Sequence, residues 1–234
     1  MNRIVFLFLG MLMVGMSGCI KPSENRYCLE YEPAIYSLKS FQPVFETVYG
    51  AVTSQEVQSI TELQDGDAIL TSYCVNTDQQ SSNDYVVAYS LAWAKIDSKY
   101  SHATVGGHSE ADDFDLPIND MILYGAVNNK IFLGFEHPES TTKGFIYEMT
   151  YDRNPSSDIP ILYCRAKVAD GNFSQSSKWG NCAFDLYDFF RMHIDTETKI
   201  VRFKIHFKIG VDDDGRDLYG AFGHGIILDI LVNL

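Results

Sequence analysis

Hydrophobic and polar residues alternate along most of this chain, and this period of two constrains the fold more than any other feature. The clearest case is Lys199–Gly210, where every second residue from Val201 to Ile209 is apolar and the residues between are Arg, Lys or His. Successive side chains of a β-strand point to opposite faces, so such a segment has one face in a core and one in water. No stretch beyond a turn or two keeps the spacing of an amphipathic helix. We therefore expect a nearly all-β protein.

The same alternation predicts the other strands. The high content of Tyr (14) and Phe (15) also favours strands. Asn128 and Asn129 separate two apolar runs, and Asn tolerates the positive φ of a tight hairpin turn. Further strands are expected at Ala68–Val75, at Tyr85–Ile96 with Tyr85, Val87, Tyr89, Leu91 and Trp93 on one face, and at residues 121–127, 130–136, 145–151, 159–168 and 225–231.

The first residues are typical of a bacterial lipoprotein signal peptide. Arg3 precedes an apolar run that is too short to span a bilayer comfortably, and the run ends in Met16-Ser17-Gly18-Cys19. Small residues at positions 17 and 18 suit a peptidase cleft, and the thiol of Cys19 would accept the diacylglycerol. We expect cleavage after residue 18 and a lipid anchor (including palmitate) at Cys19, so the mature chain is membrane-anchored but does not span the membrane.

Four cysteines remain in the expected mature chain, namely Cys28, Cys74, Cys164 and Cys182. An even number in an exported protein permits disulfides, and four cysteines allow three pairings that the sequence does not distinguish. There is no Cys-x-x-Cys spacing for zinc or redox chemistry. Because Cys74 and Cys164 lie in apolar strand patterns, small buried thiols are the preferred interpretation.

The charge excludes some partners. The chain has 31 acidic and 18 basic residues, for a formal net charge of −13. Nucleic-acid binding needs clustered Lys and Arg, so we expect no nucleic-acid partner. The basic face of the predicted strand, Arg202, Lys204, His206 and Lys208, could dock an acidic partner, although the ordinary polar side of an amphipathic strand explains it better.

Several short segments together carry a family resemblance. Asp65–Leu70 followed by Tyr73 forms a strand entry, and Asn83–Tyr85 precedes a second alternating run. Leu116–Met121 has the pattern of a connector, and Phe184–Leu186 precedes the penultimate strands. In this order they resemble the NigD-like lipoproteins of Bacteroidetes. The resemblance implies an all-β chain with a small OB-like barrel and an immunoglobulin-like β-sandwich behind the signal peptide.

The domain boundaries follow from this resemblance. We expect a signal peptide at 1–18, a lipidated tether and entering strand at 19–40, the OB-like barrel at 41–116 and the β-sandwich at 117–234. The resemblance also implies an outer-membrane lipoprotein of the cell envelope without enzymatic activity or cofactor, and with a bacteriocin-immunity-associated or ligand-binding role. The expected ligand is a protein, a peptide or a glycan, and the sequence decides neither the membrane face nor the oligomeric state.

The densest set of metal-ligand residue types lies between residues 102 and 115. His102, His108, Glu110 and Asp112 are the candidate binding residues, because His nitrogens and carboxylates could hold zinc or calcium. A solvated acidic loop between domains explains the same residues more simply, so we predict no metal site and no catalytic residues. The alternatives to a non-enzymatic binding protein are a metal-dependent envelope enzyme that uses this loop and a structural component of an envelope complex.

Overall fold

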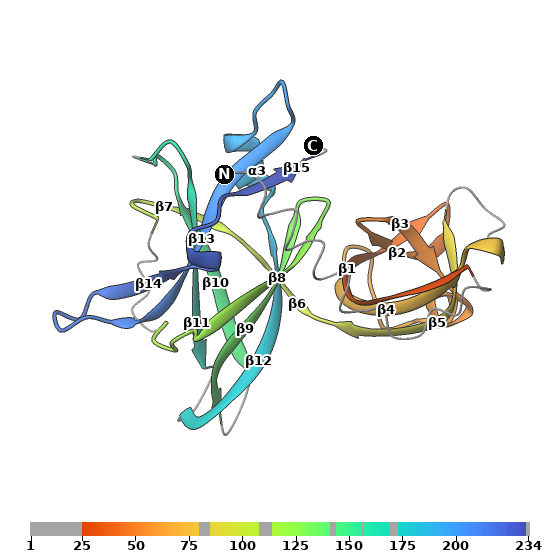
Figure 1. Cartoon of the computed structure of the whole chain (residues 1–234), viewed down its shortest axis with the longest axis horizontal. Coiled ribbons are helices and arrows are strands. Elements are labelled where there is room, and N and C mark those ends of the chain that lie inside the picture. The colour runs from red at the N-terminus through yellow and green to blue at the C-terminus, as the bar shows by residue number, and fades with distance from the viewer. Residues whose placement is uncertain are drawn as a thin grey trace.

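The chain is mostly β, as the alternating pattern predicts. The computed structural model describes residues 25–79, 85–107, 114–140, 144–155, 157–168 and 173–232, and Figure 1 shows a barrel on one side and larger sheets on the other. No helix in these ranges is long and apolar enough to cross a membrane. The expected signal peptide and Cys19 lie outside the described residues.

The N-terminal part is a closed five-stranded barrel in the order β1-β2-β3-β5-β4. Its core consists of the inward-facing residues of these strands, including Tyr36, Phe45 and Ile69. A short helix, α2 (Gln55–Ser59), begins where the hydroxyl of Ser54 accepts a hydrogen bond from the backbone N–H of Val57. The strands are β1 (Arg26–Lys39), β2 (Gln42–Thr47), β3 (Gly50–Thr53), β4 (Ala68–Asn76) and β5 (Val86–Lys95).

The remaining strands form two sheets. One sheet has the order β6-β12-β9-β8, and the other has the order β14-β13-β11-β10-β7 with β15 paired to β13. A second short helix, α3 (Tyr187–His193), follows β12. The strands are β6 (Asp97–Tyr100), β7 (His102–Thr104), β8 (Asp120–Val127), β9 (Lys130–Ser140), β10 (Phe145–Asp152), β11 (Ile161–Val168), β12 (Phe173–Asp185), β13 (Ile200–Val211), β14 (Asp217–Ala221) and β15 (Leu228–Leu231).

Both sheets contribute to one hydrophobic core. Phe135 and Phe184 come from the four-stranded sheet, Met149 and Phe203 come from the other sheet, and Phe189 of α3 packs among them. The predicted strand at Lys199–Gly210 is confirmed as β13, with Val201, Phe203, Ile205 and Phe207 in this core, whereas Ile209 at its end is 46% exposed. The predicted hairpin is also confirmed, because Asn128 has φ +53° in the turn between β8 and β9.

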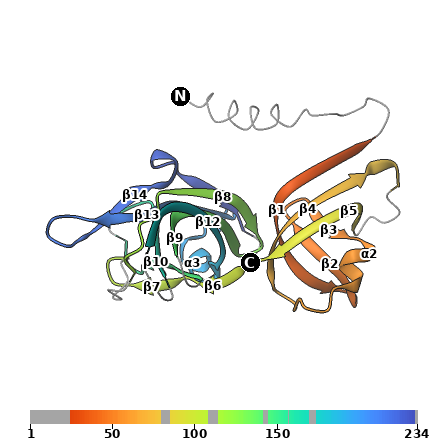
Figure 2. The same cartoon turned by 90° about the horizontal axis from the view of Figure 1, so that it is seen from below.

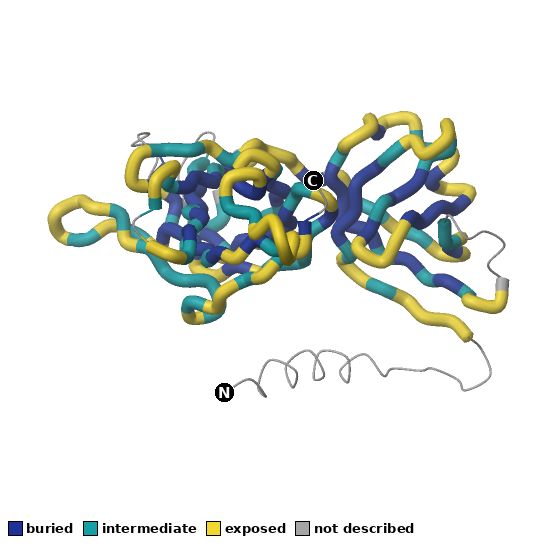
Figure 3. Tube along the Cα trace, turned by 90° about the horizontal axis from the view of Figure 1, so that it is seen from above, coloured by how far each residue is buried: buried dark blue, intermediate teal, exposed yellow. Residues whose placement is uncertain are grey.

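A third cluster joins the barrel to the sheets. Phe132 of β9 is fully buried beside Ile35 and Leu70 on the outer side of the barrel, and Val127 and Ala183 complete the contact. Figure 2 shows the barrel and the sheets side by side, and the buried part of the tube in Figure 3 continues across the junction. This apolar contact fixes the barrel against the outer face of the four-stranded sheet.

Strand pairing differs from the expected boundaries of the parts. The barrel takes in β1, which lies in the stretch expected as a tether and entering strand, and it ends at Lys95. Residues 97–104, which the expected boundaries place in the barrel, form β6 and β7, and both strands pair with the later sheets. Three pairs of the later sheets, β7–β10, β11–β13 and β6–β12, are parallel, as is β3–β5 in the barrel. Local alternation predicts a strand but not its partner, which explains these differences.

Candidate functional site

Of the four candidate binding residues between 102 and 115, the structure places His102 alone. His102 lies exposed on β7, whereas His108, Glu110 and Asp112 lie outside the described residues. Within the described ranges, no group of three His, Cys, Asp or Glu side chains is placed to hold a metal ion. The described residues that flank this loop are held at the outer face of the larger sheet instead.

Both flanks of the loop contact polar or basic side chains of that face. The Thr150 hydroxyl donates to the carbonyl oxygen of Gly107 at 2.6 Å, and Lys208 Nζ donates to the carbonyl oxygen of Phe114 at 2.7 Å. The guanidinium carbon of Arg165 lies 5.3 Å from the centre of the Phe114 ring, and Lys167 Nζ lies 4.6 Å from it. These contacts have cation–π geometry and anchor the second flank.

The basic face of β13 is largely neutralised by acidic partners. Lys208 is only 3% exposed and its Nζ lies 2.5 Å from Asp217 Oδ1. Arg202 makes a two-point contact with Asp229, at 2.8 and 2.9 Å. Two of the four basic residues of this face, Arg202 and Lys208, are thus paired with acidic residues of the chain itself.

Arg165 extends this pairing into a buried charge network. Its side chain is 3% exposed, with Nε 3.4 Å from Asp217 Oδ2 and Nη1 3.8 Å from Glu148 Oε2. The Tyr219 hydroxyl also donates to Asp217, at 3.3 Å. The network connects β10, β11, β13 and β14, and removing one partner would leave a buried charge uncompensated. We assign it a role in holding this sheet together.

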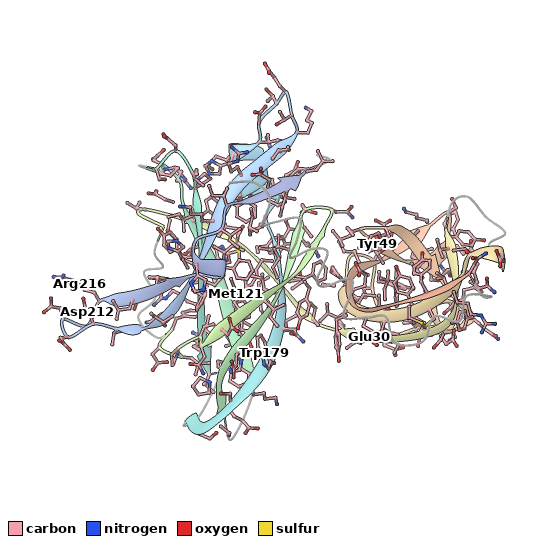
Figure 4. All side chains as sticks on the ribbon, viewed as in Figure 1. Glu30, Tyr49, Met121, Trp179, Asp212 and Arg216 are labelled. Carbon is pink, nitrogen blue, oxygen red and sulfur yellow. A yellow bond between two sulfur atoms is a disulfide. The ribbon has the colours of Figure 1, made fainter. Side chains whose placement is uncertain are left out.

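A second polar group lies in the barrel, and we call it the Tyr73 cluster: Tyr27, Glu32, Thr47, Tyr49 and Tyr73. Tyr73 on β4 is buried, whereas Tyr49 in the β2–β3 turn is 66% exposed and Tyr27 is 41% exposed. The Thr47 hydroxyl donates to the carbonyl oxygen of Gly50 and accepts from the backbone N–H of Tyr49, which fixes the turn. Figure 4 shows Tyr49 on the barrel, distant from the hairpin tip at Asp212 and Arg216.

Strand register places the members of this cluster close together, because Leu29 pairs with Tyr73, Glu32 with Thr71 and Ala34 with Thr47. Burial raises the pKa of Tyr73 to about 12, a hydrogen bond with Thr47 opposes the shift, and the charge of Glu32 adds to it, as do Tyr27 and Tyr49. Burial also raises the pKa of the half-buried Glu32 carboxyl. Three phenol groups, a hydroxyl and a carboxyl therefore meet where β1 continues beyond its pairing with β2.

A β-bulge precedes Glu32 on β1. The register of β1 with β4 shifts between Leu29 and Glu32, and Tyr31 within this bulge has φ +54°. A bulky residue in the left-handed region is rare and strained. The hydroxyl oxygen of Ser72 accepts a hydrogen bond from the backbone N–H of Tyr31 at 3.1 Å and so stabilises the bulge. Glu32 faces the same side of β1 as Ala34 and Tyr36 by ordinary alternation, and the one extra residue of the bulge turns Leu29 to that side as well.

Cys28 and Cys74 form a disulfide, with Cα atoms 4.0 Å apart on β1 and β4. The preferred interpretation of four buried free thiols is therefore wrong for this pair. The two residues face each other in the register of the strands and lie on the outer side of the barrel. The prediction is confirmed for Cys164 and Cys182, which are free and fully buried in the core of the two sheets.

No protein-family model and no curated protein matches the sequence. Solved structures do match the fold. An uncharacterized protein from Parabacteroides merdae superposes with a TM-score of 0.68 at 16% identity, over 87% of this chain and 99% of that chain. A protein of unknown function DUF1344 from Bacteroides vulgatus gives 0.54 at 12% identity, over 84% and 90%. The similarity shows a shared fold.

A third structure is named a NigD-like immunity protein from Bacteroides caccae. It covers 86% of this chain and 94% of its own at 10% identity, with a TM-score of 0.46. The similarity in fold to the Parabacteroides merdae and Bacteroides vulgatus structures extends over most of the chain. At these identities the resemblance concerns the fold, and no residue role is transferred.

Proposed function

We propose that this chain is a non-enzymatic, lipid-anchored binding protein of the cell envelope, and that it binds through the Tyr73 cluster. The observation that carries the proposal is the half-buried Glu32 carboxyl, which sits among tyrosines and has a raised pKa. Burying a carboxyl that must ionise is unfavourable for folding. Aromatic groups with a few convergent polar atoms are the usual composition of ligand sites, which occur at the mouths of β-barrels.

Assigning the barrel to the OB-like folds and the later sheets to the immunoglobulin-like sandwiches supports the same proposal. The strand order β1-β2-β3-β5-β4 suits an OB-like barrel, a fold whose members bind oligosaccharides and oligonucleotides. The two later sheets share one core, as in an immunoglobulin-like sandwich, although three of their strand pairs are parallel. Fold alone does not choose a ligand, so the argument rests on the side chains of the cluster.

The membrane anchor is proposed from the sequence. Met16-Ser17-Gly18-Cys19 would leave a lipidated Cys19, and the first barrel strand begins at Arg26. A linker of about six residues spans at most ~20 Å, so the barrel would lie close to the membrane surface. An outer-membrane location and an immunity-associated role belong to this proposal, with a protein, peptide or glycan as the ligand.

Affinity capture from native membranes tests the anchor and the binding surface together. Full-length protein, Cys19→Ala and Tyr49→Ala are compared, with Tyr100→Ala as a matched control because Tyr100 is an exposed tyrosine on β6. We expect Cys19→Ala to leave the membrane fraction, and Tyr49→Ala to stay there but lose its bound ligand. A ligand that Tyr49→Ala retains and Tyr100→Ala loses would contradict the proposal.

A further inference from the structure

We infer that the ligand of the Tyr73 cluster is a neutral oligosaccharide. This inference rests on the proposed function and gives its binding surface a chemical class. Three observations carry it: the exposed phenol rings, the hydrogen-bonding groups beside them, and the interrupted edge of β1. The chain's charge then decides between neutral and anionic sugars.

The exposed rings suit the apolar faces of sugars. Tyr49 and Tyr27 expose 66% and 41% of their surfaces, although both interact electrostatically with the buried Tyr73. A phenol ring offers a rigid apolar face and a polar tip, and it loses little conformational entropy on binding. The C–H groups of a pyranose ring pack against such a face. The Thr47 hydroxyl also holds the Tyr49 backbone, which orders this ring's attachment point before the ligand arrives.

The polar members of the cluster suit sugar hydroxyls. The Glu32 carboxylate accepts hydrogen bonds, whereas the exposed phenol of Tyr27 both donates and accepts. A sugar hydroxyl has the same double capacity, so adjacent hydroxyls can donate to Glu32 and accept from Tyr27. Hydrogen bonds from a ligand would also stabilise the ionised Glu32 carboxyl, because this half-buried group is poorly solvated without them.

The edge of β1 argues against an added peptide strand. Its pairing with β2 begins at Ala34, so the preceding residues of β1 leave one edge free of β2. A peptide could add there only through regular backbone hydrogen bonds. However, Pro33 has no N–H, and the bulge between Leu29 and Glu32 interrupts the regular course of β1. Bulges and prolines protect strand edges from pairing, so recognition must come from side chains.

The charge argues against an anionic sugar or a nucleic acid. The net charge of the chain is −13, and the cluster itself contains a carboxyl and no Lys or Arg. An acidic surface repels phosphate, sulfate and uronate groups. A neutral oligosaccharide carries the hydroxyls and apolar faces that the cluster can recognise and no charge that it would repel.

Titration calorimetry with defined sugars tests this inference. Full-length protein in a detergent without a sugar headgroup is titrated with cellohexaose, laminarihexaose, maltohexaose, mannohexaose and xylohexaose. We expect at least one of these probes to bind, and Tyr49→Ala and Glu32→Gln each to weaken that binding at least 10-fold. Tyr49→Phe keeps the ring and should bind within about threefold of the wild type. Tyr100→Ala should bind as the wild type does, and thermal unfolding verifies that each variant is folded.

Each other outcome overturns the inference in a distinguishable way. No binding of any hexasaccharide by folded wild-type protein, or equal binding by Tyr49→Ala, contradicts it. A polygalacturonate oligomer and an extended peptide pool are titrated in parallel, so that an error in the ligand class can be distinguished from an error in the binding surface. If wild-type protein binds one of these instead and Tyr49→Ala does not, the sugar class is wrong and the binding surface stands. If the variants of the Tyr73 cluster bind every probe as the wild type does, both the ligand class and the binding surface are wrong.

Discussion

At the scale of single residues, Glu32 links the stability of the barrel to its proposed binding surface. Its pKa is raised by burial, so the folded state favours the neutral acid more than the unfolded state does. The stability of the protein therefore falls as the pH rises from the ordinary value of 4.5 through the pKa of the folded state. Near neutral pH the ionised carboxyl is a stability cost, which is typical of residues retained for function.

Glu32→Gln should consequently raise the melting temperature at pH 7. The gain should shrink as the pH falls and disappear below about 4.5, where the carboxyl is protonated in both states. Differential scanning calorimetry from pH 4 to pH 8 measures this difference. Glu30→Gln is the matched control, because Glu30 lies exposed in the same bulge and should show a smaller gain. A Glu32→Gln variant less stable than wild type at pH 7 would contradict our account.

The Asp217 carboxyl compensates two buried cations, so its loss should be severe. Asp217→Ala leaves Lys208 and Arg165 without this partner, and we expect unfolding free energy to fall by about 3–5 kcal/mol. Asp214→Ala is the control, because its pair with Arg216 is exposed on both sides and should contribute at most about 1 kcal/mol. Urea unfolding of both variants tests the comparison. Equal effects would mean that the network does not depend on Asp217.

At the scale of elements, alternation predicts strands well and their pairing poorly. The predicted strand at Ala68–Val75 is β4. The single face expected for Tyr85–Ile96 is wrong. Val87 and Tyr89 are exposed, whereas Leu91 and Trp93 pack against the barrel core. β5 has one extra residue opposite β4, and this bulge reverses the faces.

The sequence pattern predicts the candidate site even less well than it predicts strand pairing. Glu32 and Tyr49 are not adjacent in sequence to Tyr73, and the pairings Leu29–Tyr73 and Ala34–Thr47 bring them together. Those pairings join strands that are far apart in sequence. The local pattern of one strand does not show which residues of another strand lie opposite it. The high tyrosine content was the one available signal. The acidic residues near position 110 belong to the densest set of metal-ligand residue types in the sequence, and they mostly lie outside the described residues.

The disulfide should stabilise the start of β1. Arg26–Leu29 pairs with β4 in front of the bulge, and the Cys28–Cys74 bond closes a loop with a sequence separation of 46 residues. Cys28→Ala with Cys74→Ala should lower unfolding free energy by about 2–4 kcal/mol and speed hydrogen exchange at residues 26–29. Cys164→Ser is a control for thiol loss without a cross-link. Unchanged exchange at the start of β1 would show that the bond does not hold it.

At the scale of the whole molecule, the junction makes the barrel and the sheets one cooperative unit. Phe132 is fully buried between them, so Phe132→Ala should cost about 3–5 kcal/mol. We expect one thermal transition for the wild type and two for the variant, because the parts would then unfold separately. Calorimetry measures both. Phe203→Ala, placed in the core of the sheets, should lower stability without separating the parts.

The proposal as a whole is that ligands contact this protein at the Tyr73 cluster. Photo-cross-linking in intact cells tests it most directly, with a benzophenone side chain placed at position 49 and, in a separate strain, at position 100. Benzophenone inserts into C–H bonds of proteins and sugars, so it reports each class of ligand. We predict a specific adduct from position 49 and none from position 100. An adduct from position 100 alone would contradict the account.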